Sequence, residues 1–272
     1  EGGCDGTPEV YGVTVYKMGL CTADPFAAIS HLGTAAGLTP DFSSCSWTYV
    51  NSDGEYESFA AGGYATLSEG TSELPSIPAG STSQSYPFAV IELGPTFHIQ
   101  DSYGPIKPLT TSTTEVTYVT SSSSSTAATS GSPGTRLTPI NTFMGLPGDV
   151  GSEDGAEVCN ASDQVDPISG KGTITGWLLD VDGKTIADNA AITSCSGVNR
   201  LIGVMDLQTS AQGPGPVTVT TDTSEIRATF VVTDNGSGIY YKGLGGGCTP
   251  TSSESCITID AGPFSVTFDV IN

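Results

Sequence analysis

The sequence predicts an all-β fold, an antiparallel β-sandwich of immunoglobulin-like or jelly-roll-like type with long loops and disulfides. Three observations favour this class. Apolar and polar residues alternate with period two in one short segment after another, as in half-buried strands. The chain holds 35 Gly and 17 Pro but only 14% charged residues, so turn formers outweigh helix formers. Seven cysteines can staple such a fold.

The candidate strands are spread along the whole chain. Near its start, Val13 and Val15 alternate with polar neighbours in a strand that ends at Cys21. The clearest alternations are residues 226–232 and 264–270. Further candidates are residues 88–93, 114–120, 173–181, 200–207, 216–221 and 256–260. Nine or so short strands are typical of a sandwich or a barrel.

Turn signals separate several of these strands. The pairs Asp182-Gly183 and Asn235-Gly236 tolerate positive φ and predict two hairpins. One short helix is expected at residues 24–33, because an aspartate can cap it, a proline suits its first turn and a glycine can end it.

The predicted organisation is an N-terminal arm, residues 1–10, followed by a β-sandwich domain, residues 11–272. A Ser/Thr-rich tract at 110–139 is expected to be a loop inserted in this domain. The alternative is that the tract links two β-domains, 1–112 and 139–272. The arm can reach roughly 30 Å when extended, far enough to touch a neighbouring subunit.

The charge balance limits the partners. Only 8 Lys and Arg stand against 29 Asp and Glu, a net charge of −21. Nucleic acid and anionic membranes are therefore not expected as partners, because both need a cationic surface. No apolar run approaches the ~18 residues of a membrane span. The chain begins like a processed protein, so we expect secretion and an extracellular or cell-surface location.

The cysteines favour disulfides over metal binding. None lie in a C-x-x-C spacing, and two histidines give little support to a zinc site. The pairing that closes the shortest loops joins Cys21 to Cys45, Cys159 to Cys195 and Cys248 to Cys256. Other pairings stay open, since spacing does not fix connectivity. Cys4 is left over, either to pair with another chain or to lie at a frayed end or in a rearranged internal bridge.

No catalytic constellation is visible, so the sequence predicts a protein that is not an enzyme. The only histidines are His31 and His98, and neither lies in a nucleophile elbow, a metalloprotease helix or a phosphate-binding loop. His98 alternates with Phe97 and Ile99 and is expected at a strand surface. A secreted glycoside hydrolase remains a third alternative, because its paired carboxylates leave no local motif.

Two weaker site predictions concern surface loops. Asp180, Asp182 and Asp188 could offer oxygen ligands to calcium around a turn, and no other cofactor is expected. The sequons at Asn160 and Asn235 could carry glycans.

Residues 10–22, which read VYGVTVYKMGLCT, resemble the first strand of small secreted proteins of marine bacteria. In those proteins a strand that ends in Lys-Met/Val-x-Leu-Cys-Thr opens a cysteine-containing β-domain. A weaker similarity extends over residues 88–99. The resemblance implies an exported surface or filament component, although the Ser/Thr-rich tract and the acidic stretch at 146–167 depart from the pattern.

The leading functional prediction is a structural subunit of an extracellular filament or cell-surface assembly. Copies of the chain would join by β-strand complementation through a chain terminus, because a free apolar strand is a sticky edge. The strands expected to pack in this way carry Val13, Val15, Phe264, Val266, Phe268 and Val270.

The alternative is a binding module. It would be a carbohydrate-binding adhesin domain or a virion-surface spike with calcium-stabilised loops, in contact with a glycan or a host surface. In that case Trp47, Tyr49 and Tyr56 would lie in a loop around Asp53-Gly54.

Overall fold

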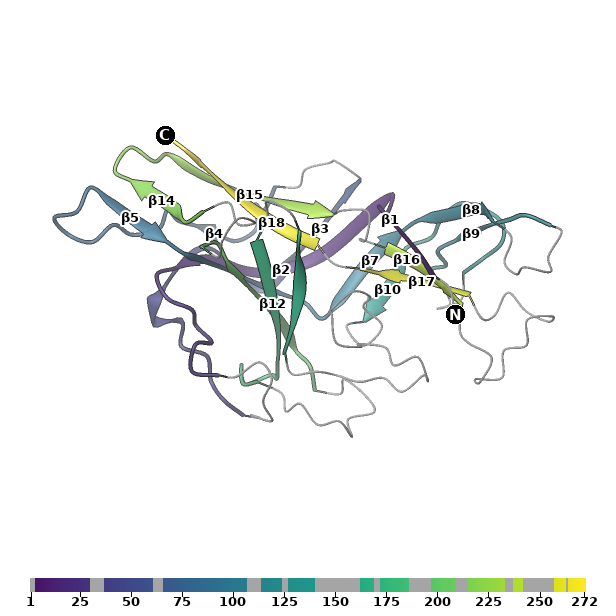
Figure 1. Cartoon of the computed structure of the whole chain (residues 1–272), viewed down its shortest axis with the longest axis horizontal. Coiled ribbons are helices and arrows are strands. Elements are labelled where there is room, and N and C mark those ends of the chain that lie inside the picture. Colours follow the sequence, from purple (N-terminus) through teal and green to yellow (C-terminus); the bar gives the residue numbers. More distant parts are fainter. Residues whose placement is uncertain are drawn as a thin grey trace.

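The protein is all-β, with every strand pair antiparallel (Figure 1). The structure, a computed structural model, describes residues 3–29, 37–60, 66–106, 114–123, 127–139, 162–168, 172–185, 197–208, 215–232, 237–241, 257–262 and 264–272. The antiparallel all-β structure confirms the predicted fold class. Within these ranges the one helical element is a 3-10 turn at Phe42–Ser44.

A nine-stranded sheet forms the centre of the fold. Its strands are β2 (Val10–Cys21), β3 (Cys45–Ala60), β4 (Thr71–Ser72), β6 (Phe88–Leu93), β7 (Thr96–Gln100), β10 (Arg136–Pro139), β11 (Ser162–Ile168), β12 (Gly172–Leu179) and β13 (Arg200–Asp206). The sheet contains strands from both sides of the Ser/Thr-rich tract.

The long strand β2 branches this sheet. One edge of β2 pairs with β3 along its whole length. The other edge pairs first with β7 and then with β6, which follow each other along β2. Between them Gly94 donates its N–H to the carbonyl of Thr14 at 2.9 Å. The short turn at Gly94 therefore carries the chain from one half of β2 to the other.

Four smaller units complete the fold. They are β1 (Gly3–Gly6) with β16 (Ser237–Tyr241) and β17 (Ile257–Ala261), β5 (Ser83–Tyr86) with β14 (Val217–Thr220), β8 (Ser102–Ile106) with β9 (Val116–Val119), and β15 (Glu225–Val232) with β18 (Phe264–Ile271). We call the last pair the β15–β18 ribbon.

The main core lies between the nine-stranded sheet and the β15–β18 ribbon, which crosses the sheet in Figure 1. Alternation places Tyr11 and Phe97 on the core side of the sheet, where both are buried. The ring of Phe264 lies 6.2 Å from Tyr11 and 6.0 Å from Phe97. Phe230 of β15 lies 5.8 Å from Phe59 of β3. The two layers are thus joined by aromatic contacts, as expected of packed sheets.

A second, smaller core covers part of the opposite face of the sheet. There the segment that follows β2 places Phe26 against Trp177, with ring centroids 4.3 Å apart and nearly parallel. Phe42 packs edge-on against Phe26 at 6.0 Å. A disulfide between Cys21 and Cys45 closes this segment at its base.

Two local predictions are wrong. The described part of 24–33 is a series of turns, because the Asp24 carboxylate accepts from the Phe26 N–H at 2.8 Å and holds an Asx turn. The predicted turn at Asn235-Gly236 lies outside the described residues, and the strands on either side of it pair elsewhere, β15 with β18 and β16 with β1 and β17. Residues 51–54 are not a loop, since β3 continues through them with a register shift against β2 and Gly54 at φ +79°.

Two further segments lie closer to the core than the sequence suggested. The expected N-terminal arm supplies β1, which pairs with β16 of the same chain. The tract at 110–139 supplies β9 and β10, and its residues Tyr118, Ala127 and Thr138 are buried.

Candidate functional sites

The β15–β18 ribbon is the longest regular strand pair outside the large sheet, among the strands described. Eight residue pairs join it, from Glu225 opposite Ile271 to Val232 opposite Phe264, with no register shift. Protein edges are usually protected by proline, lysine or a bulge, and this ribbon contains none of the three. In the described part of the chain β15 pairs with β18 alone, so its outer edge presents backbone N–H and C=O groups.

The ribbon also keeps apolar surface. Phe264 and Val266 are buried, at 7% and 1% exposure. Six other apolar side chains pack on the core but remain only half-buried: Ile226, Ala228, Phe230, Val232, Phe268 and Val270. An added strand beside β15 would cover part of this surface.

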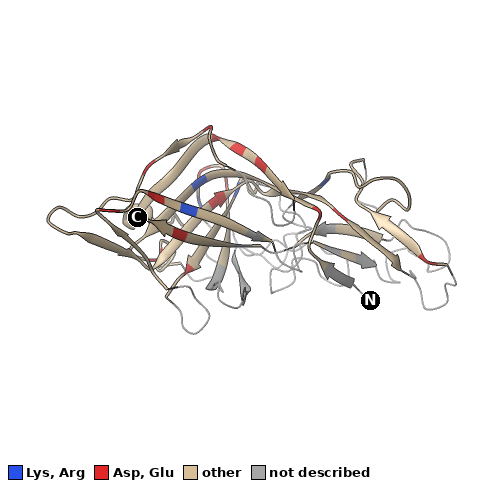
Figure 2. Ribbon diagram, turned by 90° about the horizontal axis from the view of Figure 1, so that it is seen from above, with Lys and Arg blue, Asp and Glu red and all other residues tan. Residues whose placement is uncertain are grey.

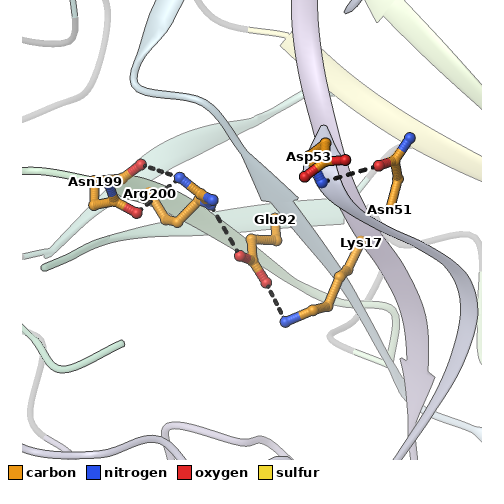
Figure 3. A network of polar contacts seen from close by, with 6 residues as sticks. All are labelled: Lys17, Asn51, Asp53, Glu92, Asn199 and Arg200. Carbon is orange, nitrogen blue, oxygen red and sulfur yellow. Dashed lines mark hydrogen bonds and ion pairs between the residues drawn. The ribbon is translucent and has the colours of Figure 1, made fainter. Parts of the chain in front are cut away.

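A charged network lies on the other face of the large sheet (Figure 3). Glu92 of β6 accepts from Lys17 Nζ of β2 at 2.9 Å and from Arg200 Nε of β13 at 3.2 Å. Arg200 Nη1 also donates to the side chain of Asn199 at 2.7 Å. The three charges come from adjacent strands, and the pairing of β2 with β6 puts Lys17 directly opposite Glu92.

Aromatic rings flank this network. The Arg200 guanidinium lies 3.5 Å from the centre of the Tyr16 ring, and Lys17 Nζ lies 5.4 Å from that of Trp47. Trp47 lies across Gly19 of the neighbouring strand, where a Cβ would come within 2.9 Å of the indole. At the far end of β2, Tyr56 lies across Gly12, where a Cβ would come within 2.5 Å of its hydroxyl. These two glycines let the rings lie close to the sheet.

Two glutamates on the core side of β3 share a hydrogen bond. Burial alone would raise the pKa of Glu55. Hydrogen bonds that its carboxylate accepts from the Tyr49 hydroxyl and from the Ser68 and Glu69 N–H groups outweigh this effect and lower the pKa of Glu55. Burial and the charge of Glu55 raise the pKa of Glu57. Burial and the bond to Glu55 raise the pKa of Tyr49 to about 12.

The Glu55 carboxylate thus connects the backbone of residues 68–69 to β3 by hydrogen bonds. Glycoside hydrolysis needs its two carboxyl groups ~5 Å or more apart, whereas Glu55 and Glu57 contact each other directly. This pair therefore has a structural role in the described fold.

A third acid, Asp101, is buried at the end of β7, with 5% exposure. Burial raises its pKa, and hydrogen bonds from the Ser237 hydroxyl and the Ser102 N–H reduce that effect only in part. Ser237 also bonds to Tyr103 Oη at 2.8 Å. Asp101 thereby connects β8 to β16.

We predict that Asp101 makes stability depend on pH. A carboxyl whose folded pKa is raised stabilises the fold below its unfolded pKa of 3.8, and that contribution is lost as the pH rises through the folded pKa. The melting temperature of the wild type should therefore fall more steeply between pH 4 and pH 7 than that of Asp101→Asn. Circular dichroism melts across this range measure the difference, and parallel curves for the two proteins would contradict the prediction.

The structure describes only part of the predicted cysteine and glycan sites. It joins Cys21 to Cys45, the first of the expected pairs. Cys4 lies in β1 opposite Ile239. The remaining predicted residues, Cys159, Cys195, Cys248, Cys256, Asn160 and Asn235, lie outside the described residues.

One aspartate of the expected calcium turn, Asp180, closes that turn with its side chain. Asp180 Oδ1 accepts from the N–H groups of Asp182 and Lys184, both at 2.9 Å, and so closes the turn at Gly183. Asp188 lies outside the described residues. In the described ranges no group of three or more His, Cys, Asp or Glu side chains is arranged to hold a metal ion.

The predicted assembly residues divide into two groups. Val13 and Val15 lie in β2, between β3 and its neighbours on the other edge, and are 1% exposed, so their packing is within the chain. Phe264, Val266, Phe268 and Val270 belong to the β15–β18 ribbon. His98 lies between buried Phe97 and Ile99, as expected, and burial lowers its pKa.

Sequence reasoning did not find the network of Lys17, Glu92 and Arg200, because it connects three strands that are distant in sequence. One signal was present: three of the eight cationic residues, Lys17, Arg200 and Arg227, fall within predicted strands beside aromatic or apolar residues. Figure 2 shows how sparse Lys and Arg are on the described strands.

No helix in the described ranges is long and apolar enough to cross a membrane. No protein-family model, curated protein or solved structure matches this chain, so the fold and the geometry above are the basis for any function.

Proposed function

We propose that the chain is a non-enzymatic structural subunit of an extracellular or cell-surface assembly, in which copies join by β-strand pairing along the β15–β18 ribbon. The observation that carries this proposal is the regular β15–β18 ribbon, in which β15 pairs with no other described strand. Backbone hydrogen bonds along such an edge supply affinity between chains, and the half-buried apolar side chains add to it.

The Cys21–Cys45 disulfide supports an oxidising location, since disulfides persist outside the cytosol. The large negative charge is compatible with a homopolymer whose contact is made by a ribbon of low charge. In β15 and β18 the charged residues are Glu225, Arg227 and Asp269, and two of them form an ion pair within β15.

The test is an assembly measurement on edge variants. Wild-type protein should form oligomers or fibres with rising concentration, followed by light scattering and negative-stain electron microscopy. Ala228→Lys places a charge on the half-buried side of β15 and should leave a folded monomer, because the lysine would have to be buried in the added contact. Thr218→Lys, at an exposed position of β14, is the matched control and should assemble like the wild type.

Two results would refute the proposal. One is a wild-type protein that stays a monodisperse monomer at high concentration. The other is assembly of Ala228→Lys equal to that of the control. If near-UV circular dichroism shows that Ala228→Lys does not fold, Thr229→Lys, on the other side of the same strand, replaces it in the comparison.

A further inference from the structure

A second surface, on the face of the large sheet that the ribbon does not cover, combines aromatic and charged side chains. We call it the polar–aromatic strip, and it consists of Tyr16, Lys17, Trp47, Tyr56, Glu92, His98 and Arg200. Thr14 lies opposite Tyr56 in the β2–β3 register, so the two point to the same face. A Cβ on Gly54 would meet both Thr14 and Tyr16, which places Tyr16 on that face too.

The strip follows β2 from Gly12 to Gly19, seven residue steps or about 23 Å at the usual rise of a strand. Tyr56 is 47% exposed and lies 4.6 Å from the His98 ring. The cross-strand glycine under Tyr56 allows this ring to lie against the sheet with its outer face available to a ligand. The Trp47 ring also lies against a glycine but packs on Phe42, with ring centroids 5.4 Å apart.

The charges of the strip are not balanced. Lys17 and Arg200 converge on one carboxylate, and among the described residues only Glu92 forms an ion pair with either. Arg200 Nη2 has no hydrogen bond to any described residue, and the side chain of Lys17 is 37% exposed. The strip is thus locally cationic in a chain of net charge −21.

We propose that the polar–aromatic strip binds a glycan through a sugar that carries a carboxylate. The carboxylate accepts hydrogen bonds from Lys17 Nζ and Arg200 Nη2, since guanidinium and ammonium groups pair strongly with carboxylates. Tyr56 offers its ring face to the C–H side of a neighbouring sugar.

The same charges disfavour other ligands. A polyanion such as a nucleic acid is repelled by the net charge of −21. A single carboxylate is small enough to interact mainly with the nearby positive charges of Lys17 and Arg200. A protein interface usually has an apolar centre, and the centre of this strip is the Lys17, Glu92 and Arg200 network.

The test compares acidic glycans with their methyl esters on an array and by calorimetric titration of the full chain. Each pair differs only in the carboxylate charge. Glycans that carry a single galacturonate or sialate residue should bind more tightly than their methyl esters, and binding should weaken with salt. Lys17→Gln and Arg200→Gln should each weaken acid binding about tenfold or more. Lys184→Gln removes one exposed positive charge elsewhere and should bind like the wild type.

Three results would overturn the proposal. They are equal binding of acids and esters, equal effects of Lys17→Gln and Lys184→Gln, and no binding of any carboxylated glycan on the array. Because the strip and the ribbon lie on different faces of the sheet, the assembly variant Ala228→Lys should keep its glycan binding. Failure of the assembly proposal and failure of the glycan proposal can therefore be told apart.

Discussion

Replacing Phe264 by alanine is expected to lower the free energy of unfolding by about 3–5 kcal/mol, as for other large buried aromatic residues. The Phe264 ring contacts Tyr11, Phe97 and Phe230, whose centroids lie 5.7–6.2 Å away. It therefore joins β18 to β15 and to two strands of the large sheet. Its removal leaves a cavity where the two layers meet. Urea denaturation followed by circular dichroism measures the loss.

Phe268→Ala is the matched control for this prediction. It lies in the same strand on the same side, but it is only half-buried. The expected loss is less than half as large, because less apolar surface is withdrawn from water at this position. Equal losses for the two variants would show that Phe264 does not hold the layers together as described.

Removal of the Cys21–Cys45 disulfide is the second large effect. The bridge closes a loop of 24 residues in sequence, and its loss by Cys21→Ala with Cys45→Ala should destabilise the fold by about 3–4 kcal/mol. The segment closed by the bridge carries Phe26 and Phe42 of the smaller core, so that core should loosen first. Hydrogen exchange resolves this region, and thermal melting gives the overall loss.

Peptide mapping under non-reducing conditions is the control for the bridge itself. It should recover Cys21 and Cys45 in one linked peptide pair from the wild type. A map that joins either cysteine to another partner, or a double variant as stable as the wild type, would contradict the prediction.

The strands with strong alternation could be predicted from sequence. The expected strand at 88–93 coincides with β6, and those at 226–232 and 264–270 coincide with β15 and β18 to within one residue at either end. Strand β3 was missed, because Asn51, Asp53 and Gly54 have the composition of a turn. Pairing with β2 on both sides of residues 51–54 keeps them within one strand, and the register shift between Val50 and Glu55 accommodates them.

The candidate sites were predictable to different degrees. Phe268 and Val270 were expected in a strand from their alternation alone, and they lie in β18 of the β15–β18 ribbon. Their place in an assembly stays a prediction. No local pattern indicated that the strand of Val13 and Val15 lies between two neighbouring strands. The polar–aromatic strip depends on Lys17, Glu92 and Arg200, which no local pattern relates.

By itself the sequence determined the all-β class and the regular strands and favoured the Cys21–Cys45 pairing, because alternation, turn residues and loop length act over short distances along the chain. Only the tertiary structure decided which strands are neighbours, that β15 pairs with β18 alone among the described strands, and that two cations meet on Glu92. The physical reason is that strand pairing and charge contacts join residues far apart in sequence, where burial of the whole core selects one arrangement among many.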